Sequence, residues 1–202
     1  MQESLDALLC ARYPAIFSVD SSAGQCLFSF ECGDGWFTLI DAACELIQHD
    51  IDTNGTQFLA SQVKEKFGGL RFYYRQGSGY ATAAVELAEF LSPFICEICG
   101  AFGKTVSLFG WMQTRCPVHE STTVYEGALL TLENNLLLAP PMGELLGAAL
   151  ALFALDGQAA ARWLTQPAPA LAHTIPLALA GTVGGQRQIL TLIGQLERGV
   201  IP

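Results

Sequence analysis

Charged side chains, and basic ones above all, are scarce in this sequence. Only 14% of the 202 residues are charged, and 10 Lys and Arg stand against 19 Asp and Glu, which gives a formal net charge of −9. An acidic surface repels phosphate backbones, and no long run of Lys or Arg offsets it. The composition therefore argues against general nucleic-acid binding, and a basic protein partner suits the charge better.

A secretory leader and a long apolar segment are also missing from the printed sequence. The first residues include Glu3 and Asp6 instead of a cationic start followed by an apolar core. The longest apolar run, residues 145–155, is about half of the ~20 residues that a helix needs to cross a bilayer. We therefore expect a cytoplasmic protein without a membrane segment.

Apolar residues are plentiful, and the composition changes along the chain. Hydrophobic residues make up 51% of the sequence, which is enough to bury a core. Residues 1–122 hold all 7 cysteines and most acidic residues, whereas residues 123–202 are rich in Ala, Leu and Gly. We predict an α+β domain over 1–122 and an all-α helical domain over 123–202, with the junction between 120 and 143.

Hydrophobic spacing and turn residues predict short elements in the first part. These are helices at 4–12, 36–48 and 81–91, a strand at 28–32, a turn at 33–35 and a polar loop at 50–55. Gly68 and Gly69 separate two β-prone segments, 58–67 and 70–75, which predicts a hairpin. A helix through residues 62–66 is the alternative.

The second part has the pattern of a helical domain. We expect helices at about 143–155, 156–165, 176–182 and 185–198. Asp156 and Thr182 suit N-caps, Pro176 suits a first helical turn, and Gly199 suits a C-terminal cap. One apolar stripe at helical spacing marks the last helix: Ile189, Leu192, Ile193 and Leu196.

Two close pairs of metal-binding residues predict a structural zinc site. Cys96-Glu97-Ile98-Cys99 is followed, after a short loop, by Cys116-Pro117-Val118-His119. Each pair can bring two ligands to one tetrahedral Zn²⁺, so the ligands would be Cys96, Cys99, Cys116 and His119. Four protein ligands leave no open coordination position, which argues against a zinc hydrolase. We therefore predict a small zinc-ribbon-like module in the first domain.

The other four cysteines show no ligand-like spacing. They are Cys10, Cys26, Cys32 and Cys44. Thiols of a cytoplasmic protein stay reduced, so we expect these residues to act as small buried hydrophobes.

Aromatic and charged residues near the metal ligands leave a second function open. The loop between the ligand pairs carries Phe102, Phe109 and Trp111, which could stack on bases. We expect these rings to cover the metal and form a small core instead. A compact charged group, Lys64, Glu65, Lys66 and Arg71, is interpreted as a solvated face.

The first part resembles an uncharacterised family of phage and prophage proteins. Three groups of residues carry the resemblance: Gly33-Asp34-Gly35-Trp36-Phe37 with Leu39-Ile40-Asp41, residues 62–73, and the Cys/His pairs. The resemblance implies no known activity.

The second part resembles the toxin-binding domain of the Xre/MbcA/ParS antitoxins. The matching residues, in order, are Trp163-Leu164, Pro167, Leu171, Pro176-Leu177, Thr182, Gly185, Ile189, Leu192-Ile193, Leu196-Glu197 and Gly199-Val200. In that family the domain binds a RES-domain toxin, an enzyme that attacks NAD, and occludes its active-site cleft. The resemblance implies a domain core of Trp163, Leu171, Leu177 and Ile189. It also implies a toxin-facing surface of Glu197, Arg198, Gly199, Val200, Ile201 and Pro202, with Arg198 as the polar anchor.

This chain departs from that family in three respects. Ala168 replaces the usual Asn, and Ala172-His173 replaces a usual Gly-Gly pair. The N-terminal helix-turn-helix that normally binds the operator is not found, and the zinc module stands in its place. The resemblance implies a non-enzymatic antitoxin whose partner is a RES-type toxin, and also implies a homodimer. The alternative is a zinc-ribbon nucleic-acid-binding regulator of phage or prophage origin.

Overall fold

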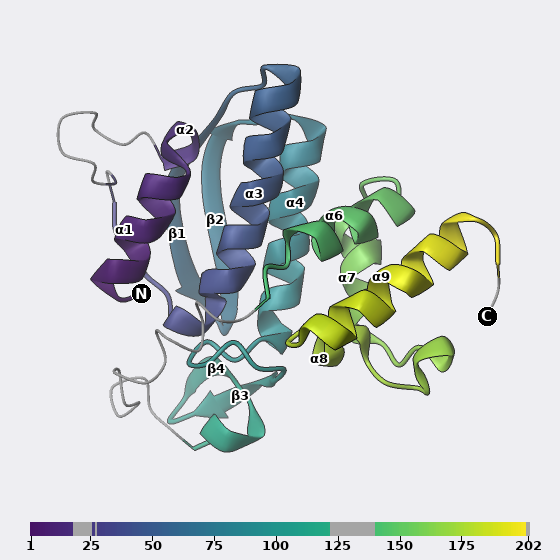
Figure 1. Ribbon diagram of the computed structural model, residues 1–202. Helices are drawn as coiled ribbons and strands as arrows, with labels where there is room; N and C mark the ends of the chain where they lie inside the picture. The colour runs from purple at the N-terminus through teal and green to yellow at the C-terminus, as the bar shows by residue number, and fades with distance from the viewer. Residues whose placement is uncertain (18–25, 27, 122–139, 201–202) are drawn as a thin grey trace.

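The computed structural model describes residues 1–17, 26, 28–121 and 140–200 (Figure 1). Its first part combines helices with two antiparallel hairpins. The elements in chain order are α1 (Glu3–Arg12), α2 (Pro14–Phe17), the 3-10 turn η1 (Asp34–Trp36), α3 (Phe37–Asn54), β1 (Phe58–Lys66), β2 (Gly69–Gln76), α4 (Gly79–Leu91), η2 (Ser92–Phe94), β3 (Lys104–Leu108), β4 (Trp111–Arg115) and η3 (Pro117–His119). The mixed helix and sheet architecture agrees with the α+β prediction.

Helix α3 is longer than the sequence pattern predicted. The polar loop expected at 50–55 is wrong, since the helix continues to Asn54 and ends at Gly55, which has a φ of 66°. The reason is Asp50, which is buried and accepts hydrogen bonds from Asn54 (2.8 Å), Thr56 (2.8 Å) and Ser78 (2.5 Å). Burial raises the pKa of Asp50, but these hydrogen bonds outweigh it and hold the pKa below its ordinary value. The carboxylate thereby joins the end of α3 to the start of α4.

Strands β1 and β2 form the predicted hairpin, and the alternative helix at 62–66 is wrong. Lys64 pairs with Arg71, and a bulge lies between Ala60 and Gln62. The two-residue turn consists of Phe67 and Gly68, which both have positive φ (56° and 75°), as a type I′ hairpin turn requires.

The strand expected at 28–32 is also wrong. In that segment Glu31 forms an isolated parallel bridge to Lys64, and the segment forms no ladder. The Glu31 amide donates to the carbonyl of Val63 at 3.0 Å, and the Glu65 amide donates to the carbonyl of Glu31 at 2.8 Å. One residue is therefore enough to hold this segment against the edge of β1.

The second part is helical, as predicted. It consists of α6 (Gly143–Leu152), α7 (Gly157–Thr165), the 3-10 turn η4 (Pro169–Leu171), α8 (Pro176–Leu179) and α9 (Val183–Glu197). Helix α6 ends three residues earlier than predicted, because Ala154 and Leu155 adopt positive φ. Asp156 and Thr182 are N-caps whose side chains accept from Ala159 and Gly185.

Helices α1, α3 and α4 lie on one face of the β1–β2 hairpin, and α6, α7 and α9 lie beyond α4 (Figure 1). One hydrophobic cluster runs from Leu5 in α1 to Ile193 in α9, so both parts of the chain contribute to it. The predicted junction lies mostly in residues 122–139, outside the described residues. The division into 1–122 and 123–202 stays a prediction.

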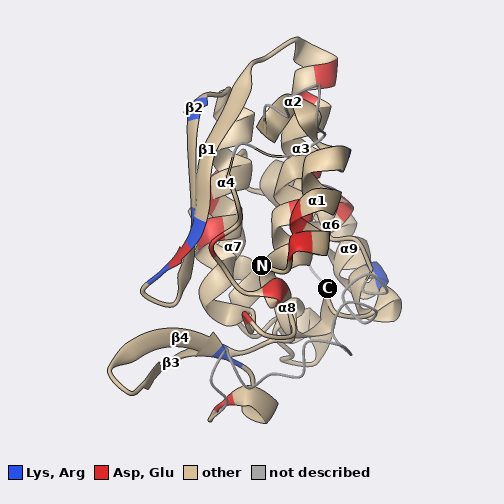
Figure 2. Cartoon of the chain, turned by 90° about the vertical axis from the view of Figure 1, so that its left-hand side faces the viewer, with Lys and Arg blue, Asp and Glu red and all other residues tan. Residues whose placement is uncertain are grey.

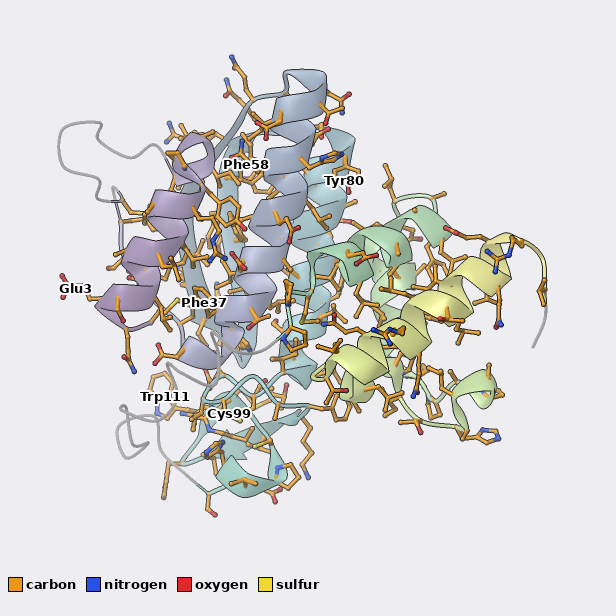
Figure 3. All side chains as sticks on the ribbon, in the orientation of Figure 1. Glu3, Phe37, Phe58, Tyr80, Cys99 and Trp111 are labelled. Carbon is orange, nitrogen blue, oxygen red and sulfur yellow. A yellow bond between two sulfur atoms is a disulfide. The ribbon has the colours of Figure 1, made fainter. Side chains whose placement is uncertain are left out.

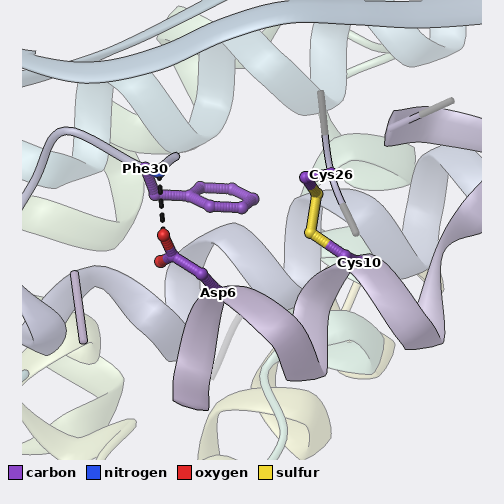
Figure 4. Close-up of a disulfide and its surroundings, with 4 residues drawn as sticks. All are labelled: Asp6, Cys10, Cys26 and Phe30. Carbon is purple, nitrogen blue, oxygen red and sulfur yellow. Dashed lines mark hydrogen bonds between the residues drawn. A yellow bond between two sulfur atoms is a disulfide. The ribbon is translucent and has the colours of Figure 1, made fainter. Parts of the chain in front are cut away.

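Two of the cysteines expected to be reduced are paired. Cys10 and Cys26 form a disulfide with Cα atoms 5.6 Å apart, close to the point where Asp6 accepts from the amide of Phe30 (Figure 4). The expectation was wrong for these two residues because segments distant in sequence meet here. Cys44 is buried and free, and Cys32 is half-buried and free.

Among the described residues, no single helix has the length and hydropathy to cross a membrane. Helices α6 and α7 pass that test only as a pair, and they are bent by 112° relative to each other.

Candidate functional site

The four predicted metal ligands come together at one point. Cys96 and Cys99 lie in the turn after η2, and Cys116 and His119 lie at the start and end of η3. Their ligand atoms all lie within 4.8 Å of one another, so the group could hold a metal ion. We call residues 95–119 the metal knuckle; it lies below α3 in the view of Figure 3, where Cys99 is labelled.

The ligand spacing suits a tetrahedral site. The Sγ atoms of Cys99 and Cys116 are 3.7 Å apart, and Nδ1 of His119 lies 3.3 Å from Sγ of Cys116 and 3.7 Å from Sγ of Cys96. A tetrahedron with Zn–S bonds of about 2.3 Å and Zn–N bonds of about 2.0 Å has edges of about 3.5 to 3.8 Å. Two of these three separations match such edges and the third is slightly shorter, and thiolate and imidazole are donors that suit Zn²⁺, so the group could hold a metal ion of this kind.

The Cys99 side chain and the backbone amides of the first ligand turn favour the thiolate form of Cys96. Gly100 has a φ of 74°, and its amide donates to the carbonyl of Cys96 at 2.8 Å. The hydrogen bond from Cys99 lowers the pKa of Cys96 to about 4, with help from backbone amides that include Ile98. The same contact raises the pKa of the Cys99 thiol. A site with one thiolate already favoured is suited to a cation.

The Gly33-Asp34-Gly35-Trp36 motif joins the knuckle to α3. A Cβ at Gly33 would overlap the carbonyl oxygen of Glu97, and one at Gly35 would overlap the carbonyl oxygen of Cys96. The Gly35 amide donates to the Glu97 carbonyl at 2.9 Å, and Nε1 of Trp36 donates to the carbonyl of Ile95 at 2.7 Å. The sequence pattern predicted a turn at 33–35 but not its contact with the metal ligands. Two glycines directly before a tryptophan are a signal that another backbone segment lies close to this turn.

A buried ion pair connects the two ligand-bearing segments of the metal knuckle. The guanidinium of Arg115 pairs with the carboxylate of Glu97, and both side chains are almost fully buried. Burial raises the pKa of Glu97, and Arg115 opposes this shift. Glu97 lies between the first two ligands and Arg115 precedes the third, so this pair fixes the two ligand pairs relative to each other.

Two of the three aromatic rings in the loop do not cover the metal site, and the expectation was wrong for them. Phe109 and Trp111 are 86% and 74% exposed at the tip of the β3–β4 hairpin, and only Phe102 is partly buried, with its ring centroid 6.5 Å from that of Phe94. Both strands of this hairpin are largely exposed away from the metal ligands, so its tip lies outside the core. The small apolar cluster at the ligands contains Ile98 instead.

The end of α9 has a well-defined cap. The Gly199 amide donates to the carbonyl of Leu196 at 2.9 Å, and the Val200 amide donates to the carbonyl of Gln195 at 3.0 Å. With a φ of 71° at Gly199, this is a Schellman motif, which turns the chain away from the helix axis. Residues 197–200 are exposed, and Ile201 and Pro202 lie outside the described residues.

The four residues expected to form the core of the second part lie between its helices. Leu177 and Ile189 are buried, whereas Trp163 and Leu171 are partly buried against the same cluster. Gly185 allows the start of α9 to approach α8, since a Cβ there would overlap the carbonyl oxygen of Leu179.

Comparison with known protein families gives one match, and it lies in the second part of the chain. A model of the antitoxin Xre/MbcA/ParS C-terminal toxin-binding domain matches residues 148–199. No curated protein and no solved structure matches the chain. The matched segment runs from the middle of α6 to the cap of α9, and therefore supports an antitoxin-like, toxin-binding role for these helices.

The structure also accounts for one departure from the family pattern. Ala172 and His173, which stand where the family has a Gly-Gly pair, both have positive φ (53° and 59°). The backbone therefore keeps a left-handed conformation that glycine adopts at no steric cost. The loop is held by a hydrogen bond from the His173 amide to the carbonyl of Ala168 at 3.0 Å.

Proposed function

We propose that this protein is an antitoxin that binds a RES-type, NAD-attacking toxin and blocks its active-site cleft. It acts by binding and not by catalysis. The observation that carries the proposal is the match of residues 148–199 to an antitoxin toxin-binding domain. The exposed end of α9, which lies at the limit of that match, agrees with it.

The docking surface we propose is the last turn of α9 and the tail that follows it. Arg198 and Glu197 are exposed, and the Schellman motif directs Val200 away from the helix. An exposed guanidinium can form two parallel hydrogen bonds with a carboxylate or phosphate group, which makes Arg198 the polar anchor. The apolar tail from Val200 to Pro202 would then enter the cleft.

A groove beside α9 provides a second area of contact. It has a volume of about 650 Å³ and is lined by the η4 loop and by Arg187, Thr191 and Gln195 of α9. The exposed side of α9 is polar here, whereas Leu171 and Leu179 add apolar surface to the groove, so the groove could accept a helix or loop of a partner. We therefore extend the proposed toxin contact along the exposed side of α9.

The metal knuckle has a structural role in this proposal. Cys96, Cys99, Cys116 and His119 would hold one Zn²⁺, which would cross-link the two ends of the β3–β4 hairpin. Four protein ligands leave the ion no position for a substrate. The protein would act in the cytoplasm, where a toxin finds NAD and where the Cys10–Cys26 pair would be kept reduced. We propose a homodimer and a phage or prophage origin as secondary points.

Growth rescue tests the toxin-binding proposal. Co-expression of the chain with a RES toxin should restore growth, and truncation after Gln195 should abolish the rescue. A sharper pair exchanges single charges: Arg198→Glu should lose protection, whereas Arg162→Glu, at an exposed position of α7, should retain it. Protection by the truncated chain, or equal effects of both charge reversals, would contradict the proposed surface.

A further inference from the structure

The outer face of the β1–β2 hairpin concentrates positive charge on an acidic protein. Of the 10 Lys and Arg in the chain, this face carries Lys64, Lys66, Arg71 and Arg75 (Figure 2). The alternate residues Val63 and Phe72 are buried against the helices, so these cations point away from the core. We call them the basic face.

The basic face is only partly compensated within the described part of the chain: Nη1 of Arg71 donates to the carbonyl of Leu70 at 2.6 Å, and its charge opposes the rise that burial causes in the pKa of Glu89. None of its four cations forms an ion pair there, and Lys64 stands directly opposite Arg71 across the two strands. Glu31 lies beside Lys64 and accepts from Gln62 at 3.2 Å, while the carboxylate of Glu65 accepts from the amide of Gly68 at 2.6 Å. Like charges opposite each other destabilise a hairpin. An anionic ligand bound between Lys64 and Arg71 would therefore reduce their electrostatic repulsion.

Exposed aromatic rings continue the basic face at both hairpin tips. Phe67 is 74% exposed, next to Lys66, and Trp111 of the second hairpin is equally exposed. The tip of the first hairpin is held against the side of the second, because Oγ1 of Thr114 in β4 donates to the carbonyl of Gly68 at 2.6 Å. Between them lies a groove of about 420 Å³, lined by Lys66, Phe67, Trp111 and neighbouring residues.

Both hairpin tips hold an exposed phenylalanine in a conformation that is unfavourable for it. Phe67 and Phe109 have φ values of 56° and 52°, a region that bulky residues rarely adopt. Neither ring gains burial in return, since Phe109 is 86% exposed. Asn or Gly would suit both turns better, so the rings serve something other than folding.

We propose that the basic face and the two aromatic tips form a binding site for single-stranded nucleic acid. The cations follow the phosphates along the hairpin, and Phe67 and Trp111 stack on unpaired bases, which a duplex would not offer. Tyr73, half-exposed with the ammonium of Lys64 5.4 Å from its ring centroid, adds a third ring within the track. The acidic remainder of the surface confines binding to this face. This site is separate from the end of α9 and does not depend on the proposed function.

Fluorescence anisotropy with a labelled oligo(dT) of about 15 nucleotides tests the site, since known single-strand binding modules of the OB type cover roughly 4 to 16 nucleotides. Four phosphate contacts predict a slope of about −3 for the logarithm of affinity against the logarithm of salt concentration. The double variant Lys64→Gln, Arg71→Gln should reduce that slope by about half. Phe67→Asn, which suits the turn, and Trp111→Thr should each weaken binding about tenfold at an unchanged slope.

The matched control is the double variant Lys104→Gln, Arg162→Gln, which removes the same charge from exposed positions of β3 and α7. It should bind oligo(dT) like the wild type. Equal weakening by both double variants, equal affinity for the hybridised duplex, or absence of binding at low salt would overturn the proposal. So would a dimer that dissociates in the Lys64→Gln, Arg71→Gln variant while its oligo(dT) affinity stays unchanged, since the face would then bind a second copy.

Discussion

The indole nitrogen of Trp36 donates a 2.7 Å hydrogen bond to the carbonyl of Ile95, the residue before the first metal ligand. Trp36 is fully buried directly before α3, and this contact therefore joins the metal knuckle to the longest helix of the described chain. The knuckle is part of the main fold and not an appendage, which makes its integrity measurable as stability.

Trp36→Phe should destabilise the protein by about 1 to 3 kcal/mol. An aromatic ring remains, but it is smaller than the indole and leaves a cavity, and the carbonyl of Ile95 is left buried without its donor. Urea denaturation followed by circular dichroism measures the loss. Trp163→Phe, at a partly buried position of α7, is the control with a smaller expected effect. Equal losses in both variants would show that the Trp36 hydrogen bond does not contribute measurably to stability.

Gly35→Ala should lower the zinc affinity. The added Cβ would overlap the carbonyl oxygen of Cys96 and approach the amide nitrogen of Gly100 to 2.6 Å, so the first ligand turn must move. Competition with a chromogenic chelator measures the change, and outer supports of a zinc site typically contribute 10- to 100-fold. Gly184→Ala adds the same methyl group in open space and should leave the affinity unchanged.

Metal removal should loosen a defined part of the chain. The ion would join Cys96 and Cys99 to Cys116 and His119, so chelation should increase hydrogen exchange throughout residues 95–119. A cavity of about 220 Å³ lies between Cys99 and Thr182, the N-cap of α9, and the effect should reach that cap as well. The hairpin β1–β2 away from its turn serves as the internal reference. Unchanged exchange at 95–119 after complete chelation would contradict a structural metal.

The paired variant Ala172→Gly, His173→Gly should stabilise the protein by about 1 kcal/mol. Both residues hold positive φ, which costs non-glycine residues roughly 1 to 2 kcal/mol each, and the larger unfolded-state entropy of glycine offsets part of the gain. Thermal unfolding measures it. The same Ala→Gly exchange at Ala178, an exposed position of α8, should instead destabilise by about 1 kcal/mol. A loss of stability in the paired variant would refute the argument.

The disulfide between Cys10 and Cys26 should contribute about 3 kcal/mol to the free energy of unfolding. Its sequence separation is 16, and closing a loop of this length in the unfolded chain typically has an effect of that size. Cys10→Ala, Cys26→Ala removes it, and its urea midpoint should match that of the reduced wild type. Cys44→Ala controls for loss of a buried free thiol. No difference between the oxidised wild type and the double variant would show that the bond does not stabilise the fold.

Local signals in the sequence predicted the elements whose causes are local. Asp156 and Thr182 cap their helices as expected, and the CxxC-type spacing brings four ligands together, since each depends on residues a few positions apart. The errors have distant causes. The polar segment after residue 50 stays helical because Asp50 meets Ser78 from another helix.

The same distinction explains what was missed at the metal knuckle. The contacts of Gly33 and Gly35 with the ligand turn link segments about sixty residues apart, and no local pattern encodes that approach. Aromatic residues are usually buried, so the exposure of Phe109 and Trp111 could be known only once the tip of the hairpin was seen to lie outside the core.

The most direct test of the central claim is a hydrogen-exchange comparison of the free chain and its complex with a catalytically inactive RES toxin. The account predicts protection at residues 183–200, strongest around Arg198, and no change along β1 and β2. Protection of the hairpins with an unaffected end of α9 would contradict it.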